Sequence, residues 1–230
     1  MPSQRDVGVV IVAAGHGRRF GTERPKQFQS LGHAPVLLHA IRPFASHPAI
    51  AHIVVVLSAD DAAAPPEWLA SLDDGRMRIV AGGAERHDSV RAGFVALPID
   101  CSIVLIHDGA RPFPAAAMID AGIAAARHGH GAIPALPICD TIKRADEFGR
   151  VLSTVDRHGL WTVQTPQAFP RALLERAHAA AAGDGPIATD DAALVERLGE
   201  PIDLIPGSPR NLKITTPHDL VLAEWYLEHP

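Results

Sequence analysis

VGVVIVAAGHGRRFGTERPKQ, residues 7–27, begins with an unbroken apolar run and continues with glycines and basic side chains. Residues 7–14 are β-branched or small and apolar, which is typical of a central parallel strand that is buried on both faces. The run ends at Gly15, and Gly17 and Gly21 follow it. Because parallel strands alternate with helices, this segment predicts an α/β fold whose first strand leads into a glycine-rich loop.

The loop after this strand combines a permissive backbone with positive charge. Glycines let backbone N–H groups approach an anion closely, and cations beyond them supply the countercharge that a polyphosphate needs. The basic side chains here are Arg18, Arg19, Arg24 and Lys26. A plain strand-to-helix turn with solvated arginines is the alternative, but four cations beside three glycines favour phosphate binding.

Two common phosphate-binding motifs do not fit this loop. A dinucleotide fold requires its third glycine one place earlier and an acidic residue about 20 residues further on. A Walker loop requires Gly-Lys-Ser/Thr, whereas Gly21 is followed by Thr22 and Glu23. The pattern AAGxGxR with a later PKQ instead resembles nucleotidyltransferases that activate a small phosphate with a nucleoside triphosphate.

Composition narrows the class of protein further. A chain of 230 residues, 47% hydrophobic and 20% charged, predicts a single domain over residues 1–230. The net charge of −5 argues against a nucleic-acid partner. The two cysteines, Cys101 and Cys139, lie in apolar stretches, which disfavours a disulfide or zinc site. Without a membrane-spanning run or a signal-peptide core, we expect a cytoplasmic protein that does not engage membranes.

The rest of the chain alternates predicted strands and helices. Together with residues 7–14, they predict a doubly wound, mostly parallel Rossmann-like sheet. The resemblance of the first loop to nucleotidyltransferases implies that this sheet is of the nucleotide-diphospho-sugar transferase type. Residues 131–139 contain Pro134 and Pro137, so we expect an edge or a bulged strand there. The predicted strands are residues 53–57, 77–81, 102–106, 131–139 and 202–205. The main predicted helices are residues 35–46, 84–97, 114–128, 170–182 and 189–198, with a last helix that begins at Thr216 and Pro217.

Residues 138–156 interrupt this rhythm with an alternating pattern that predicts a β-hairpin arm. The hairpin has little apolar surface of its own, and an isolated two-stranded ribbon is marginally stable in water. We therefore expect it to pack on a partner subunit in a homodimer.

Polar residues follow several of the predicted strands. Asp108 follows residues 102–106, where open α/β sheets bind ligands, and a carboxylate there is a natural ligand for Mg²⁺. The alternative is a helix cap or a pair with Arg111. The wider set contains cations and hydroxyls but no nucleophile–base pair, which suits phosphoryl or nucleotidyl transfer. Its members are Arg18, Arg19, Lys26, Asp108, Arg111, Thr141, Arg157, Thr165 and Lys213.

Nine short motifs occur in a characteristic order over nearly the whole chain. They are AAGHGRR (13–19), PKQ (25–27), GGxERxxSV (82–90), HDGARP (107–112), DTxK (140–143), VDRxGLW (155–161), TPQ (165–167), TD (189–190) and NLKIT (211–215). Single motifs are shared with other nucleotidyltransferases, whereas the ordered set is far more specific. The set resembles the 2-C-methyl-D-erythritol 4-phosphate cytidylyltransferase family of the non-mevalonate isoprenoid pathway.

This resemblance implies CTP and methylerythritol phosphate as substrates, Mg²⁺ as cofactor, and roles for individual residues. The residues implied to contact the nucleotide are Ala13, Ala14, Gly15, Gly17, Gly83, Ser89 and Asp108, and Asp108 would also bind the metal. The residues implied to act in catalysis are Arg19, Lys26, Arg157 and Lys213. The residues implied to bind the acceptor are Arg111, Thr141, Arg157, Thr165 and Lys213. The arm would cross a homodimer interface, so that Thr141 and Arg157 serve the neighbouring subunit.

Three alternatives stay open. A ribitol 5-phosphate cytidylyltransferase would share the CTP machinery and differ in the acceptor pocket. A nicotinamide-dependent oxidoreductase would need the missing ribose acid, and a nucleotide sensor would have no reason to keep Lys26, Arg157 and Lys213. The chain also departs from the family pattern, since Ala84 replaces a residue that is often acidic. In addition, Gly109 replaces alanine, which we expect to add freedom to the loop after Asp108.

Overall fold

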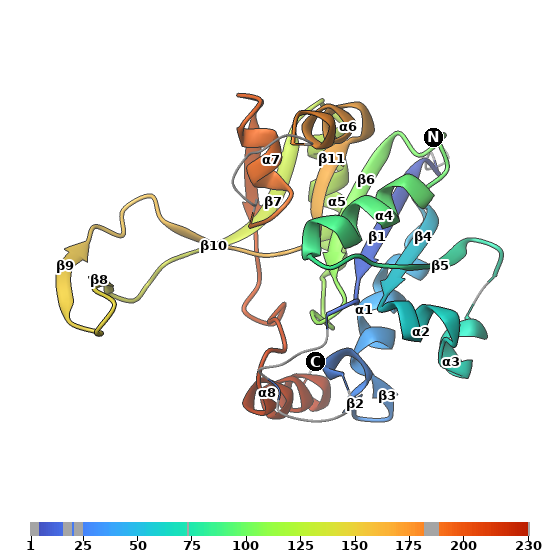
Figure 1. Ribbon diagram of the computed structural model, residues 1–230, viewed down its shortest axis with the longest axis horizontal. Coiled ribbons are helices and arrows are strands. Elements are labelled where there is room, and N and C mark those ends of the chain that lie inside the picture. Colours follow the sequence, from blue (N-terminus) through green and yellow to red (C-terminus); the bar gives the residue numbers. More distant parts are fainter. Residues whose placement is uncertain (1–4, 16–19, 21–24, 73, 182–188, 230) are drawn as a thin grey trace.

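The computed structural model describes residues 5–15, 20, 25–72, 74–181 and 189–229. Four parallel strands form one half of an eight-stranded sheet, in the spatial order β6–β1–β4–β5. They are β1 (Val7–Val12), β4 (Ile50–Leu57), β5 (Met77–Ala81) and β6 (Ile103–Asp108). Figure 1 shows these strands in the right-hand part of the molecule, on the side away from β8 and β9.

The other half of the sheet mixes strand directions. The antiparallel strand β11 (Gln167–Pro170) lies between β6 and β7 (Gly131–Pro137). Strand β10 (Trp161–Val163) also pairs antiparallel with β7, and β12 (Ile202–Pro206) pairs parallel with it. The predicted mostly parallel α/β sheet is thus confirmed.

The prediction that residues 131–139 form an edge or a bulged strand is wrong. Strand β7 has β12 along one side and β10 with β11 along the other. The Pro134 carbonyl accepts the Gln164 N–H at 2.7 Å. Because the N and O of one strand residue point to the same side, the N–H that Pro134 lacks would face the junction between β10 and β11. There the ladder is already interrupted, so the proline is tolerated inside the sheet.

Helices cover both faces of the sheet, as expected for a doubly wound fold. On one face, α1 (Val36–Ala45) and α5 (Ala116–Arg127) pack against Val9 and Ile11 of β1. On the other face, α4 (Arg86–Ala96), α6 (Arg171–Ala180) and α7 (Ala192–Glu196) pack around Val10. Alternate residues of one apolar strand therefore build two separate cores. The shorter elements are η2 (Lys26–Phe28), β2 (Ser30–Leu31), β3 (Ala34–Pro35), α2 (Ala59–Ala63) and α3 (Glu67–Ala70).

A third, smaller core attaches the end of the chain to the sheet. Helix α8 (Pro217–Glu228) begins with the predicted Thr216 cap, whose hydroxyl accepts the Asp219 N–H at 3.4 Å. Just before it, Ile214 is fully buried, and its N–H donates to the Ala110 carbonyl at 2.8 Å. This contact brings the segment around Ile214 beside the end of β6.

The predicted arm protrudes from the sheet. Strands β8 (Ile142–Ala145) and β9 (Val151–Val155) form a separate two-stranded sheet, which Figure 1 shows far from the other elements. Three apolar side chains on this arm are strongly exposed, Phe148 by 76%, Val151 by 64% and Leu152 by 63%. The expectation of a protruding arm is confirmed. The expectation that the arm has little apolar surface is wrong, because these three side chains lie uncovered in the single chain.

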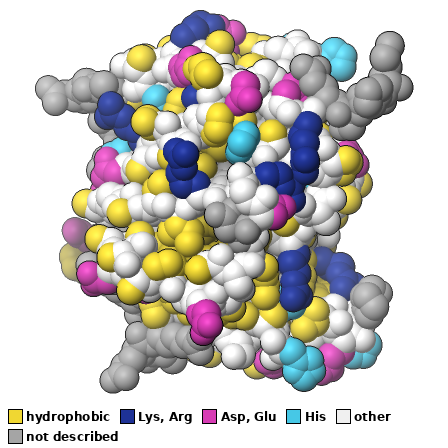
Figure 2. Space-filling view, turned by 90° about the vertical axis from the view of Figure 1, so that its right-hand side faces the viewer, with side chains coloured by type: hydrophobic (Ala, Val, Ile, Leu, Met, Phe, Trp, Pro, Cys, Tyr) yellow, Lys and Arg dark blue, Asp and Glu magenta, His cyan; other side chains and the backbone are white. Residues whose placement is uncertain are grey.

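The surface shows no gathering of one charge on the face seen in Figure 2. There the coloured Lys and Arg side chains are separated by acidic and apolar ones, instead of forming a basic stripe. Among the described residues, no helix combines the length and apolar character needed to cross a lipid bilayer.

Candidate active site

The carboxyl ends of β1 and β6 flank the point at which the sheet reverses its order. From β1 the chain proceeds to β4 and β5 on one side, and it then returns to β6 on the other. Open α/β sheets bind ligands in the crevice at such a switch point. A cavity of about 460 Å³ lies here. The described residues that line it are 12–15, 26, 27, 83–86, 89, 108, 110 and 213.

The segment after β1 is held in an extended form beneath this cavity. The Ala13 N–H donates to the Val56 carbonyl at 2.8 Å, and the Gln27 side-chain amide donates to the Ala13 carbonyl at 2.7 Å. Gln27 is only 2% exposed. Its buried amide fixes the PKQ segment against the β1 loop, so that neighbouring Lys26 lines the same cavity. Sequence reasoning assigned no role to Gln27, although its place in the PKQ motif was the available signal.

The loop after β5 forms another wall of the cavity. The Ser89 hydroxyl accepts the Gly83 N–H and donates to the Glu85 carbonyl, both at 3.2 Å. The Asp88 carboxylate accepts the Glu85 N–H at 3.1 Å, which caps α4. The first turn of α4 lines the cavity, and the amino end of a helix favours anions. Ser89 thus shapes the loop that presents Gly83 to the cavity.

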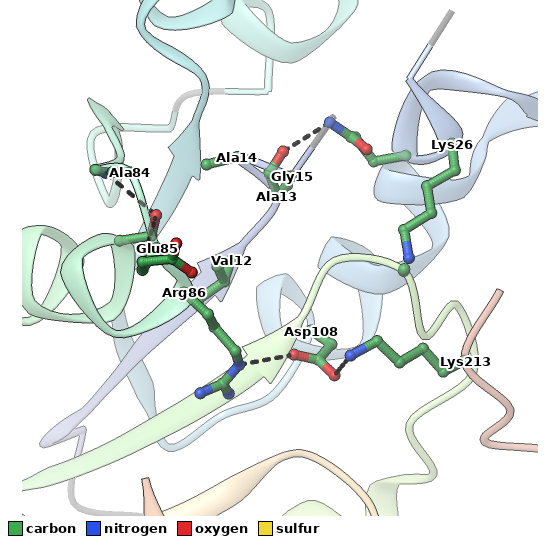
Figure 3. A pocket seen from close by; sticks show the side chains of 14 residues that line it. Val12, Ala13, Ala14, Gly15, Lys26, Ala84, Glu85, Arg86, Asp108 and Lys213 are labelled. Carbon is green, nitrogen blue, oxygen red and sulfur yellow. Dashed lines mark hydrogen bonds and ion pairs between the residues drawn. The ribbon is translucent and has the colours of Figure 1, made fainter. Parts of the chain in front are cut away.

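Asp108 lies at the centre of a cluster of cations. The Lys213 ammonium is 2.8 Å from Oδ2, the Arg86 Nε is 3.6 Å from Oδ1, and the Arg111 Nε is 3.7 Å from Oδ2. Figure 3 shows Arg86 and Lys213 approaching the carboxylate from opposite sides. Burial by itself would raise the pKa of the Asp108 carboxyl, but Lys213 and Arg86 lower this pKa overall. The group is therefore an ionised carboxylate at the edge of the cavity.

A second buried carboxylate orients Arg86. The Arg86 Nη1 donates to Oδ2 of Asp191 at 2.8 Å, and Asp191 is only 1% exposed. Burial by itself would lower the pKa of the Arg86 guanidinium, but Asp191 and Asp108 raise it overall. Arg86 is thus a permanent cation in the cavity wall that sequence reasoning did not assign. Its partner is 105 residues away, so no local pattern could have revealed the pair.

Four of the five expected acceptor-binding residues, Thr165 among them, lie outside the described cavity lining. Arg111 lies beside Asp108, but its Nη1 donates to the Asn211 carbonyl at 2.7 Å. Thr141 is exposed on the arm. Arg157 lies at the base of the arm and donates to the Cys139 carbonyl. The structure of one chain therefore does not bring Thr141 and Arg157 to the cavity that holds Lys26 and Lys213.

Thr165, the other residue expected in the acceptor pocket, is buried behind the cavity. It is 4% exposed, and its hydroxyl accepts the Asp108 N–H at 3.0 Å. The same oxygen lies 3.0 Å from Nδ1 of His107. Arg18, Arg19, Arg24 and Gly17 lie outside the described residues.

The expectation that Gly109 adds freedom to the loop after Asp108 is wrong. The Gly109 N–H donates to the Val12 carbonyl at 2.9 Å, which ties the loop to β1. A Cβ atom at this position would lie 2.9 Å from the Ala13 Cβ and 3.2 Å from the Val12 oxygen. The missing side chain therefore permits close packing of this loop against the segment after β1.

Asp108 is suited to bind a divalent cation. Mg²⁺ usually takes one or two protein carboxylates together with substrate phosphates and water, and a single ionised carboxylate at the edge of a cavity of about 460 Å³ fits that preference. One group of three potential ligands, His52, Asp100 and Cys101, was found among the described residues. It lies at the opposite, amino-terminal edge of the sheet, and burial raises the pKa of the Cys101 thiol to about 11. Both cysteines are free, Cys101 in a buried position and Cys139 in an exposed one.

Comparison with known proteins agrees with this geometry. The model of the 2-C-methyl-D-erythritol 4-phosphate cytidylyltransferase family matches residues 7–229. The chain is 48% identical over 227 residues to the Syntrophotalea carbinolica enzyme of that name, covering 97% of both chains. It is 43% identical to the Salinibacter ruber enzyme, covering 95% of this chain and 91% of the relative. The crystal structure of the Thermus thermophilus enzyme superimposes with a TM-score of 0.79 at 34% identity, covering 95% of this chain and 98% of that one. The chain therefore belongs to the 2-C-methyl-D-erythritol 4-phosphate cytidylyltransferase family.

Proposed function

We propose that the protein transfers the cytidylyl group of CTP to 2-C-methyl-D-erythritol 4-phosphate. The products are 4-diphosphocytidyl-2-C-methyl-D-erythritol and pyrophosphate. The observation that carries this proposal is the convergence of Lys26, Arg86 and Lys213 around Asp108, in one cavity at the switch point of the sheet. The names of the relatives favour methylerythritol phosphate as the acceptor, and they do not favour ribitol 5-phosphate.

The chemistry is an in-line attack of the acceptor phosphate on the α-phosphorus of CTP. Phosphoryl transfer needs mainly positioning and charge neutralisation, so fixed cations are the expected machinery. We propose that Lys26 and Lys213, together with Arg19, stabilise the negative charge that develops around this phosphorus. No general base is required, because a phosphate monoester is ionised near neutral pH, its second pKa being about 6. This agrees with the absence of a nucleophile–base pair among the described cavity residues.

We assign the nucleotide to the walls built by the β1 loop and the α4 loop. Ala13, Ala14, Gly15, Gly83 and Ser89 present small side chains and backbone groups there, which lets a nucleotide approach closely. Asp108 would hold Mg²⁺ near the triphosphate, where the ion supplies further neutralisation of phosphate charge. Arg86, held by Asp191, adds a cation to the same wall.

We further propose that the protein is a homodimer in which each arm completes the site of the other subunit. The exposed apolar side chains of the arm support this, because an isolated hairpin with such a surface is marginally stable in water. Thr141 and Arg157 would then reach the acceptor in the partner's cavity. Cytoplasmic location stays a prediction from the sequence.

Mixing two inactive variants tests the arm exchange. Arg157→Ala removes the proposed contribution of the arm to acceptor binding, and Lys213→Ala removes a proposed catalytic cation from the cavity. If the arm serves the partner, a mixed dimer has one intact site, so a 1:1 mixture that exchanges subunits regains roughly a quarter of the wild-type activity. If each arm serves its own cavity, no mixed dimer contains an intact site. In that case the mixture stays inactive and the exchange is refuted.

Pyrophosphate release tests the reaction itself. We expect release from CTP only when methylerythritol phosphate and Mg²⁺ are both present, and EDTA should abolish it. Ribitol 5-phosphate, ATP and GTP serve as matched controls for acceptor and nucleotide. Faster release with ribitol 5-phosphate would overturn the substrate assignment, and release that persists without acceptor would indicate a hydrolase.

A further inference from the structure

A ring of hydrogen bonds lies directly behind the carboxylate that faces the cavity. The Asp108 N–H donates to the Thr165 hydroxyl, which lies 3.0 Å from Nδ1 of His107. On the other side of the imidazole, Nε2 of His107 is 3.0 Å from the Arg111 carbonyl. The Arg111 N–H donates back to the Asp108 carbonyl at 2.9 Å, which closes the ring. His107 is fully buried.

The chemistry of the partners determines the direction of each bond. A backbone carbonyl can only accept, so Nε2 of His107 must carry the proton that faces Arg111. In a neutral imidazole Nδ1 is then an acceptor, and the Thr165 hydroxyl donates to it. That hydroxyl can at the same time accept the Asp108 N–H. A neutral imidazole with its proton on Nε2 therefore satisfies every group in the ring.

The surroundings of the imidazole favour this neutral form. The Phe44 ring packs against it, with 4.9 Å between the two ring centroids. The imidazole is wholly buried, and each of its two nitrogens faces an uncharged partner. A group with these neighbours is unsuited to donate a proton in the reaction, and its two nitrogens are occupied by structural hydrogen bonds.

We propose that His107 is a positioning residue for CTP and metal binding, and that it acts together with Thr165, whose hydroxyl contacts both the Asp108 N–H and the imidazole. The imidazole spans from the Thr165 hydroxyl to the Arg111 carbonyl, so it braces the turn that carries the Asp108 carboxylate. The two residues between Asp108 and Arg111 are Gly109 and Ala110, and neither has a side chain that could hydrogen-bond across the turn instead. The ring thus determines where the carboxylate lies relative to Lys213 and Arg86. This inference rests on the proposed function of Asp108, and it gives Thr165 a task other than contact with the acceptor.

Variants can separate the two bonds of the imidazole. His107→Asn places an amide oxygen where Nδ1 lies, and it keeps the bond to Thr165. His107→Gln places an amide N–H near the position of Nε2, and it keeps the bond to the Arg111 carbonyl. His107→Phe removes both bonds and keeps the ring shape. Thr165→Val removes the hydroxyl, whereas Thr165→Ser retains it.

The measurement is the affinity for CTP with Mg²⁺ in the absence of acceptor, by calorimetry. We expect His107→Phe and Thr165→Val each to weaken it roughly tenfold, and the double variant to be no weaker, because both break one ring. Thr165→Ser should stay close to wild type, while His107→Asn and His107→Gln should be intermediate. The KM for the acceptor, measured at saturating CTP, should change less than twofold in all of them. If the ring served only stability, the variants would lower Tm without weakening CTP binding more than acceptor binding.

His47→Phe is the matched control. The side chain of His47 is 9% exposed, its Nε2 is 3.0 Å from Asp120, and its Nδ1 accepts the Ala49 N–H at 3.3 Å. It lies at the opposite edge of the sheet, so its loss should lower Tm but leave CTP affinity unchanged. Nitrogen-15 NMR of wild type should assign the Nε2–H tautomer to His107, with the resonance identified by its loss in His107→Gln. This readout holds even if His107→Phe does not fold.

Several outcomes would overturn the proposal. They are an Nδ1–H tautomer, unchanged CTP affinity in folded His107→Phe, additive losses in the double variant, or a Thr165→Val effect confined to the acceptor KM. CTP binding and tautomer do not depend on the acceptor. A wild type that binds CTP but does not use methylerythritol phosphate would therefore refute the proposed function while leaving the ring intact.

Discussion

The cavity at the switch point and the protruding arm are built on opposite principles. Around the cavity, bonds join residues far apart in sequence, such as Arg86 with Asp191 and Asp108 with Thr165. In the arm, the bonds are local, such as that of Lys143 with Thr154, and apolar side chains face outward. The cavity is therefore determined by the folded chain itself. The arm, by contrast, has an apolar surface that the chain itself leaves exposed.

This contrast separates two kinds of functional residue. Lys26, Asp108 and Lys213 are already together in one chain, and their positions follow from the sheet and its buried hydrogen bonds. Thr141 lies on the arm and Arg157 at its base, away from the cavity of their own chain, and in the proposed homodimer they would serve the cavity of the partner. Substitutions in the cavity should therefore act within one subunit, whereas the proposed homodimer predicts that those in the arm act on the site of the partner.

The largest effect is expected from Lys213→Ala. It removes the cation 2.8 Å from Asp108, so kcat/KM should fall on the order of 10³-fold. Pyrophosphate release gives the rate, and thermal unfolding should show a retained fold. Arg176→Ala removes an exposed cation on α6 and should leave the rate unchanged. Near-normal turnover of Lys213→Ala would break the assignment of this cavity as the reaction centre.

A smaller effect, on stability, is expected from Asp108→Asn. Three cations would lose their carboxylate, which should lower the free energy of unfolding by about 2 kcal/mol at neutral pH. Because the folded state lowers the pKa of this carboxyl, its contribution is present above about pH 4 and is lost as pH falls further. Urea unfolding of wild type and Asp108→Asn should therefore show a difference in the free energy of unfolding that becomes smaller at acid pH.

The control for this prediction lies in the arm. Asp140 is exposed, so Asp140→Asn should change neither the free energy of unfolding nor its dependence on pH. If the difference in free energy of unfolding between wild type and Asp108→Asn grew toward low pH, the predicted direction of the pH dependence would be wrong. It would mean that the cations do not stabilise the ionised carboxylate.

Leu152→Asp tests whether the exposed apolar surface of the arm is a subunit interface. A charge on this exposed apolar surface should disrupt a dimer contact and lower activity about tenfold, while the subunit stays folded. Sedimentation at several concentrations should show a shift toward monomer. Val95 on α4 is 72% exposed, so Val95→Asp is a matched control outside the arm. A dimer that persists in Leu152→Asp, with full activity, would argue that the arm surface is not an interface.

The smallest effect is expected from Gly109→Ala. The added methyl group would meet Ala13 and the Val12 carbonyl, so the segment after β1 must shift by a few tenths of an ångström. We expect a loss of about 1 kcal/mol in stability and a few-fold rise in the KM for CTP. Gly129→Ala, at a glycine with φ of +91° and no crowding, should lose stability without affecting that KM. An unchanged KM in Gly109→Ala would show that the loop adapts freely.

Much of this protein could be predicted from local patterns. The apolar run of β1, the α/β alternation, the arm, and the cap of α8 at Thr216 are all confirmed by the structure. The pairing of β7 was predicted wrongly, because its prolines suggested an edge and the junction between β10 and β11 could not be foreseen. The prediction for Gly109 was wrong for a related reason. Only the folded structure shows that the segment after β1 packs closely against this glycine.

By itself, the sequence determined the fold class, the family and the chemical nature of the site. These follow from periodicity, glycine and proline positions, and ordered motifs, all of which act over a few neighbouring residues. Only the tertiary structure decided that Asp191 orients Arg86, that Gln27 holds the β1 loop, and that His107 and Thr165 brace Asp108. The reason is physical: a hydrogen bond or ion pair depends on distance in space, and the folded chain brings together groups such as Arg86 and Asp191, which the sequence separates by 105 residues.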